Sequence, residues 1–216
     1  MDVTRLRQTD AAYPPALSQY LGKDAPSSIA ILGDLQALKA NKLALFCSVQ
    51  CPAKLILQAH DLAHELVQAG VTVMGGFHSP VEKECLRILL RGSQPVIICP
   101  ARGLKRMRIP KEWKKPLDEG RLLFLSPFPD NRRRSDIQMS LYRNRFVAAL
   151  AEQIFITYAA PSGKTEQFCC EILAWHKPVY TLSHASNGNL ITLGVRPLTL
   201  GEGAQFGFGL DKRSED

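Results

Sequence analysis

Apolar runs and helical periodicity alternate along most of the chain. Short apolar runs typical of buried strands occupy residues 43–47, 71–74, 95–99, 122–125, 154–157 and 179–182. Between them, apolar residues recur every three or four positions, which predicts helices over residues 52–69, 79–90, 135–152 and 163–175. Continuous apolar strands separated by helices favour a mostly parallel sheet covered on both faces. The pattern therefore predicts an α/β fold of the Rossmann-like, doubly wound kind, in a single domain.

The two ends of the chain follow this pattern less closely. Residues 1–40 are predicted to be a lead-in with a short strand at residues 29–32, and residues 41–198 the Rossmann-like domain. Residues 199–216 are rich in glycine and charge, which predicts a flexible tail.

Local signals support the start of the second predicted helix. Ser79 suits a helix N-cap, Pro80 suits the first helical position, and Glu82 can complete a capping box with Ser79. In doubly wound sheets, ligands bind beyond the carboxyl ends of the strands. The loops that follow the predicted strands are therefore the places to look for a site.

The loop after the fifth predicted strand has the composition of a phosphate-binding loop. Ser162, Gly163, Lys164 and Thr165 stand where a helix begins, so free backbone N–H groups and the positive helix end face the loop. The loop is not a Walker A motif, because Tyr158 stands where its first glycine should be. The alternative is a helix capped by Ser162 with an exposed lysine.

Two further segments are weaker candidates for anion contacts. Gly75 and Gly76 permit close backbone approach after a strand, and His78 could touch a ligand, although Glu82 disfavours a second negative charge there. Arg143 and Arg145 flank an asparagine, and arginine binds phosphate in a bidentate manner. The alternative for the two arginines is a solvated helix face.

Net charge adds a polyanion to the expected partners. The chain of 216 residues carries a formal charge of +7, which favours polyanion partners without identifying one. Basic residues gather in two loops after predicted strands: Arg102, Lys105, Arg106 and Arg108, then Arg132, Arg133 and Arg134. Their place on the ligand edge favours an electrostatic track for a nucleic-acid backbone over a solvated face.

Other patterns narrow the function classes. The cysteines form no pair of CxxC knuckles and the histidines no metal spacing, so we expect neither a metal nor a cofactor. No nucleophile elbow or other catalytic set occurs, so we expect no enzyme. No apolar run approaches the ~20 residues of a membrane span, and no signal peptide begins the sequence, so we expect a cytoplasmic protein without membrane contacts.

Several segments together resemble the DprA/Smf (DNA-processing protein A) family. Residues 143–150 (RNRFVAAL) resemble its RNRIIAGL segment, Ser162-Gly163 resembles its SG turn, and residues 186–194 resemble its S-x-G-x-N-x-L-I-x-x-G-A stretch. Tyr13-Pro14 and Leu17 match its lead-in. The resemblance implies a protein that binds single-stranded DNA and loads a RecA-type recombinase.

By the same resemblance, the candidates for the DNA-binding pocket are Arg143, Arg145, Ser162, Gly163, Lys164 and Asn189. The chain also departs from the family pattern. Cys47-Ser48-Val49 stands where the family has GSR, so Ser48 is kept and the arginine is absent. This departure leaves open whether the family's DNA contacts are retained.

Two alternatives remain at this point. Residues 161–166 also resemble the PGG-x-GT-x-x-E motif of LOG phosphoribohydrolases, which handle nucleotides, although the glutamate is at a different offset. The other alternative is a non-enzymatic partner protein that keeps the fold and has lost the site. The sequence leaves open whether the chain forms a homodimer.

Overall fold

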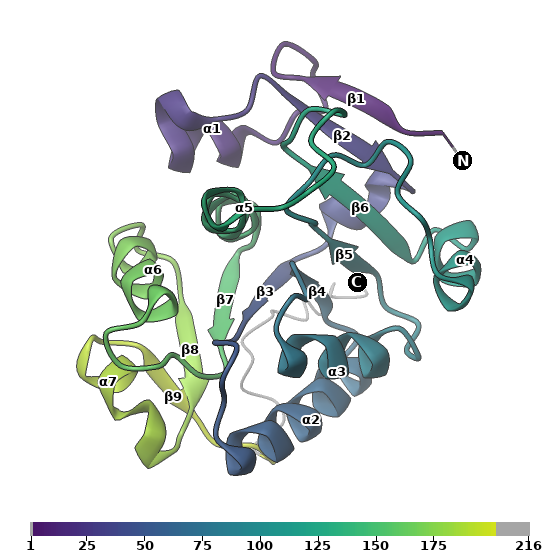
Figure 1. Cartoon of the computed structure of the whole chain (residues 1–216). Helices are drawn as coiled ribbons and strands as arrows, with labels where there is room; N and C mark the ends of the chain where they lie inside the picture. The colour runs from purple at the N-terminus through teal and green to yellow at the C-terminus, as the bar shows by residue number, and fades with distance from the viewer. Residues whose placement is uncertain (1, 202–216) are drawn as a thin grey trace, which may run out of the picture.

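A nine-stranded sheet forms the centre of the protein (Figure 1). The computed structural model describes residues 2–201. The strand order of the sheet is β1-β2-β6-β5-β4-β3-β7-β8-β9. The strands are β1 Thr4–Arg7, β2 Ser28–Leu32, β3 Lys42–Phe46, β4 Thr72–Gly75, β5 Val96–Ile98, β6 Leu122–Ser126, β7 Gln153–Ile156, β8 Val179–Leu182 and β9 Arg196–Leu198. β2 pairs antiparallel with β1 and with β6, and every pair from β6 to β9 is parallel.

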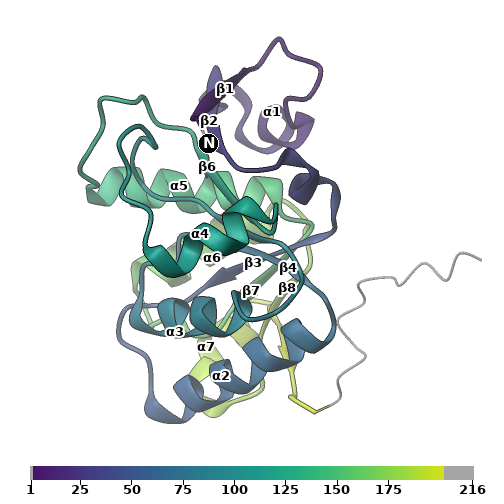
Figure 2. The same ribbon diagram turned by 90° about the vertical axis from the view of Figure 1, so that its right-hand side faces the viewer.

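Helices cover both faces of the sheet. They are α1 Pro15–Leu21, α2 Ala53–Gln68, α3 Pro80–Leu89, α4 Lys111–Asp118, α5 Ile137–Leu150, α6 Lys164–Leu173 and α7 Gly188–Thr192. Short 3-10 helices are η1 Gly22–Asp24, η2 Leu35–Lys39 and η3 Ala185–Asn187. One core contains residues of α2, α3 and α4, and the other contains residues of α1, α5 and α6. Figure 2 shows α5 and α2 on opposite sides of β3 and β4.

The central strand β3 shows why both faces must be covered. Leu43 and Leu45 belong to the core under α2, α3 and α4, whereas Ala44 and Phe46 belong to the core under α1, α5 and α6. Successive side chains of a strand point to opposite faces, so a fully apolar strand is stable only between two helical layers. The predicted α/β, doubly wound fold is confirmed.

The direction of strand order reverses at β3 and β7. From β3 the chain proceeds outward to β4, β5 and β6, while β7, β8 and β9 extend the sheet on the other side. The loops after β3 and β7 therefore lie side by side, and the backbone N–H of Ser48 donates to the carbonyl of Tyr158 at 2.9 Å. Such a switch point is where ligands bind in open α/β sheets.

Most predicted elements are present, and the omissions have local causes. The capping box of Ser79 and Glu82 is formed at the start of α3. Helix α4 was not predicted, because Pro116 lies inside it and lysines dominate its sequence. The lead-in contributes β1, β2 and α1 to the same fold. The predicted tail begins at residue 199, and its residues 202–216 lie outside the described part of the chain.

Candidate nucleic-acid interface

Ser48 and Thr165 join the two loops of the switch point. The Ser48 hydroxyl accepts a hydrogen bond from the backbone N–H of Ala160 at 3.1 Å and donates one to the Thr165 hydroxyl at 3.0 Å. The Ser48 hydroxyl thereby donates and accepts within the protein, and the Thr165 hydroxyl serves as an acceptor. Their contribution to a site is to hold the loop after β7 against the loop after β3.

The start of α6 keeps part of its capacity for an anion. Gly163 is the N-cap, without a side-chain cap, and a Cβ there would lie 2.8 Å from the carbonyl oxygen of Ala160. Among residues 2–201, the backbone N–H groups of Lys164 and Thr165 have no protein acceptor. Lys164 is exposed at the same helix end. Two free amides, a helix dipole and a lysine favour an anion here.

Glu166 forms hydrogen bonds with other groups of the same loop and with Asn189. Its carboxylate accepts the backbone N–H of Ser162 at 2.6 Å and a hydrogen bond from the side-chain amide of Asn189, which also donates to the carbonyl of Ala159 at 3.1 Å. Ser162 adopts a positive φ of 59°. Because Asn189 donates to Glu166, it orients the glutamate that shapes the loop, and the side-chain amide nitrogen of Asn189 is engaged within the protein.

The loop after β4 is occupied by a carboxylate of the chain itself. Glu82 is buried, with 6% of its surface exposed, and accepts the backbone N–H groups of Cys47, His78 and Ser79 at 3.1, 2.8 and 2.8 Å. These three amides are therefore engaged within the protein. Gly75 ends β4, and His78 is exposed beside it.

Arg143 lies inside the protein beneath the same loop. Its side chain is buried, and it donates to the carbonyl of Cys99 at 3.0 Å and to the side chain of Asn144 at 2.8 Å. A Cβ at Gly76 would overlap the guanidinium, so this position must be glycine while Arg143 stays in place. Burial lowers the pKa of Arg143, and the negative charge of Glu82 opposes that shift.

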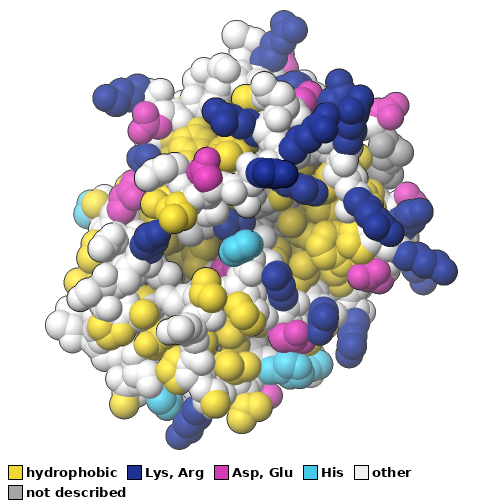
Figure 3. Space-filling view, in the orientation of Figure 1, with side chains coloured by type: hydrophobic (Ala, Val, Ile, Leu, Met, Phe, Trp, Pro, Cys, Tyr) yellow, Lys and Arg dark blue, Asp and Glu magenta, His cyan; other side chains and the backbone are white. Residues whose placement is uncertain are grey.

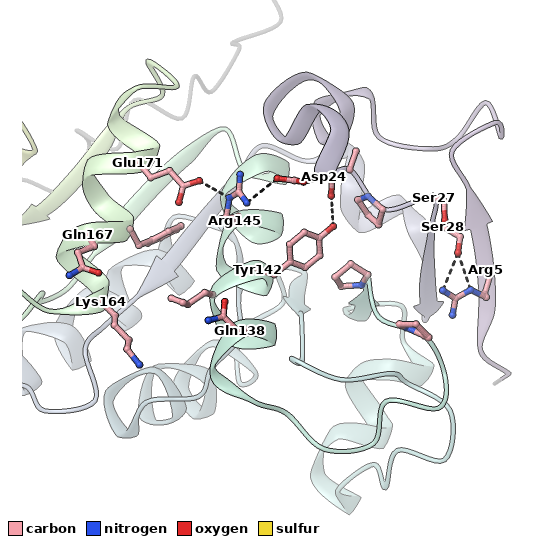
Figure 4. Close-up of a pocket in the computed structure, with 16 residues that line it drawn as sticks. Arg5, Asp24, Ser27, Ser28, Gln138, Tyr142, Arg145, Lys164, Gln167 and Glu171 are labelled. Carbon is pink, nitrogen blue, oxygen red and sulfur yellow. Dashed lines mark hydrogen bonds and ion pairs between the residues drawn. The ribbon is translucent and has the colours of Figure 1, made fainter.

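Arg145 is committed to ion pairs on the opposite side of α5. Its guanidinium lies 2.6 Å from a carboxylate oxygen of Glu171 and 3.4 Å from one of Asp24. Figure 4 shows Arg145 between these two acids, while Lys164 extends away from them. These residues line a groove of about 1050 Å³ between α5, α6 and residues 24–28. The charge of Arg145 in this groove is therefore neutralised by two carboxylates.

A pocket of about 390 Å³ brings several predicted site residues together at the switch point. Those that line it are His78, Arg143, Lys164 and Thr165. Glu82 and Asp136 line it as well, so its charge is mixed. In the sequence, Glu82 is indicated by its place in a capping box and by its negative charge beside the loop after β4. Among residues 2–201, no group of three His, Cys, Asp or Glu side chains is arranged to hold a metal.

The two basic loops form one surface. The backbone N–H of Gly103 donates to the carbonyl of Arg132 at 2.8 Å, and the Ser126 hydroxyl donates to the carbonyl of Arg102 at 2.6 Å. Within residues 2–201, none of the basic side chains of these loops forms an ion pair with a carboxylate: Arg102, Lys105, Arg106, Arg108, Arg132, Arg133 and Arg134. Figure 3 shows Lys and Arg side chains gathered over this upper and right-hand part of the face. We call these residues the basic loops.

Comparison with known proteins identifies the family. The model of the family DNA recombination-mediator protein A matches residues 4–190. The chain belongs to this family. The DNA recombination-mediator family places the chain among proteins of DNA processing and recombination. No curated protein matches the chain in sequence.

Solved structures agree with the family and the fold. DNA processing protein A from Streptococcus pneumoniae is similar with a TM-score of 0.77 and 20% identity, covering 94% of this chain and 73% of that one. The Helicobacter pylori protein, whose structure gives insights into a unique single-stranded DNA binding mode, has a TM-score of 0.72 and 18% identity, covering 93% and 92%. A molybdenum cofactor binding protein from Rippkaea orientalis shares the fold more distantly, with a TM-score of 0.52 and 10% identity over 74% and 88%. No helix within residues 2–201 is long and apolar enough to cross a membrane.

Proposed function

We propose that this chain binds single-stranded DNA, with the phosphate backbone lying on the basic loops and reaching the Lys164 end of α6. The observation that carries the proposal is that the cations of the basic loops are mostly exposed and have no carboxylate partner within the described residues. Phosphate contacts need donors that are free in this way.

The position of these cations supports the same proposal. The basic loops follow β5 and β6, and Lys164 follows the loop after β7, so all of them stand at the carboxyl edge of the parallel strands. The switch-point pocket is lined by Lys164 and by Ser135, which directly follows the second basic loop. Single-strand binding is the mode described for the Helicobacter pylori relative. An electrostatic track beside a pocket is a common arrangement for such binding.

A non-catalytic role agrees with the site. The carboxylate of Glu166 is engaged by the Ser162 amide and by Asn189, which disfavours its use as the glutamate of the nucleotide-hydrolase alternative. A RecA-type recombinase and a second copy of this chain stay predicted partners. Pull-down of RecA on DNA-bound beads and analytical ultracentrifugation would test these two predictions.

The test is fluorescence anisotropy of labelled oligo-dT across a salt series, beside a matched duplex. We expect preference for the single strand and an affinity that falls with log salt, with a slope of about −0.7 for each phosphate contacted. A variant with Arg132→Ala, Arg133→Ala and Arg134→Ala should have a slope shallower by about 2, because three contacts are lost. The side chains are exposed, so its thermal stability should be unchanged.

A charge-matched control carries Lys39→Ala, Lys54→Ala and Arg196→Ala. These side chains are also exposed, and they lie outside the basic loops. The control should bind with nearly the wild-type slope. Equal losses in the two triple variants would show that only net charge matters, and absence of binding at low salt would overturn the proposal.

A further inference from the structure

A further hollow lies between α3 and α4, on the opposite side of the sheet from α5 and α6. It has a volume of about 520 Å³, and its apolar wall includes Phe77, Leu86, Ile98 and Trp113. Figure 3 shows apolar side chains in this region bordered by Lys and Arg side chains. A partly enclosed apolar hollow with a few polar groups at its rim is the usual form of a small-molecule site.

The rim of this hollow is positively charged. Lys83, Arg87 and Arg91 of α3 and the following turn line it at intervals of four residues, which places them along one side of the helix. Arg87 is paired with Glu84 at 2.8 Å, whereas Lys83 and Arg91 have no carboxylate partner within residues 2–201. Glu112 is the acidic residue on the lining. The rim therefore favours an anion.

Trp113 supplies a planar wall. Its ring packs on Phe124 with centroids 5.9 Å apart, it is only partly buried, and it also lines the hollow. Aromatic side chains stack with nucleobases regardless of sequence, and cations beside them hold the phosphate. A peptide could not bind here by strand addition, because β4 and β5 are interior strands with both edges paired.

The backbone at the base of the hollow is unusual. Phe77 is buried and adopts φ of 47°, a left-handed conformation that bulky residues rarely adopt. Such strain persists where the surroundings enforce it, and it gathers at ligand-binding sites. Ile98 also lines the hollow, ends β5 and leads into the first of the basic loops.

From these observations we infer that the hollow binds one nucleotide, with its base against Trp113 and its phosphate facing Lys83 and Arg91. The same chemistry has two sources. One is a free nucleoside monophosphate. The other is an unstacked nucleotide of a DNA strand held on the basic loops, and in that form the inference rests on the proposed function.

Tryptophan fluorescence can report on this site directly. The chain has two tryptophans, and Trp175 stacks on Tyr20 at 5.3 Å in the other core. A Trp175→Phe background leaves Trp113 as the only tryptophan. Stacking of a base should quench its emission saturably. The probes are deoxyadenosine monophosphate, a twelve-nucleotide oligo-dA, and deoxyribose 5-phosphate as the probe without a base.

Variants of the rim test the phosphate contact without disturbing the core. Lys83→Ala with Arg91→Ala should weaken quenching by the nucleotide at least about tenfold, the expected loss of two charge-assisted hydrogen bonds. Lys54→Ala with Lys114→Ala removes the same charge from exposed positions outside the lining, and should change the affinity by less than twofold. Trp113→Leu, followed by calorimetry, should weaken binding roughly 5- to 150-fold.

Each outcome decides a separate point. Quenching by the free nucleotide that depends on Lys83 and Arg91 supports the inference even if oligo-dT fails to bind. Quenching by oligo-dA alone, lost in the basic-loop variant, supports it for the strand. The inference is overturned if no probe quenches Trp113, and the proposed function still stands where oligo-dT binds in that case. Equal quenching by deoxyribose 5-phosphate would also overturn the inference, because that probe carries no base.

Discussion

The arginines of α5 and the arginines of the loop before it lie close in sequence and behave differently. Arg143 is 5% exposed and donates to Cys99 and Asn144, and Arg145 is held by two carboxylates. Residues 132–134 are exposed and have no ion pair within the described part of the chain. A buried cation must use its donors on protein groups, whereas a loop cation keeps them for a ligand.

This contrast assigns different work to the two sets. Arg143 ties α5 to the carbonyl of Cys99, and Arg145 ties it to α6 and to Asp24. In the proposed function, the basic loops supply the charge that a polyanion meets. Burial and pairing within the protein decide between these roles. Variants of each set should therefore separate stability from binding.

The largest effect is expected from Arg143→Ala. The substitution leaves the buried carbonyl of Cys99 without its charged donor, so the free energy of unfolding should fall by about 1.5–3 kcal/mol. Urea denaturation measures this loss. Arg133→Ala is the control and should stay within about 0.5 kcal/mol of wild type. An Arg143→Ala protein as stable as wild type that no longer binds DNA would reverse the contrast.

A smaller effect is expected from Arg145→Ala. Two partly exposed ion pairs are lost, which should lower the free energy of unfolding by about 1 kcal/mol. The salt slope of DNA binding should not change, because the charge of Arg145 is already neutralised. Lys164→Ala is the matched comparison, with unchanged stability and a slope shallower by about 0.7. A shallower slope for Arg145→Ala would show that its ion pairs open on binding.

The sequence predicted the parts of the fold that local patterns determine. Continuous apolar runs such as Leu43–Phe46 indicate a strand between two helical layers, and Ser79 with Glu82 indicates a helix start. Helix α4 was missed because Pro116 interrupts its pattern. Sequence spacing could not show that Glu82 accepts hydrogen bonds from three backbone amides, or that Arg143 fills the space beside Gly76. These residues meet only in the folded chain.

The same reasoning applies to the candidate site. The loop after β7 and the two basic loops could be predicted, because the ends of parallel strands share one edge. Which donors remain free could not be predicted, since Asn189 and Glu166 lie 23 residues apart and engage one another only through the fold. The roles of Ser48, Ser162 and Thr165 depend on the same contacts. These contacts distinguish residues that build the edge from residues that face a ligand.

The smallest effect is expected at the other end of α5, where Lys177 extends the contrast to a lysine. Its ammonium donates to the carbonyls of Ala148, Ala149 and Ala151 at 2.8, 2.7 and 2.6 Å. Burial lowers its pKa to about 8, with Glu152 opposing the shift. Below pH 8 the ammonium is charged in both the folded and the unfolded chain, and the folded chain carries the full cost of its burial.

Between pH 8 and the unfolded pKa of about 10.4, the unfolded chain binds more protons at this lysine, so that cost is relieved as pH rises. Wild type should therefore gain stability relative to Lys177→Met across this window. The gain should be well under the limit of about 1.4 kcal/mol per pH unit, because solvent screens a partly exposed group. Urea denaturation of both proteins at pH 7 and pH 10 measures the difference. Burial raises the pKa values of Cys85 and Cys99, which lowers stability at alkaline pH in both proteins, so the comparison cancels this effect.

Lys164→Met is the control from the ligand edge, where the lysine is exposed. A difference that shrinks with pH would mean that the carbonyl bonds outweigh burial and that Lys177 is held as an ammonium by the end of α5.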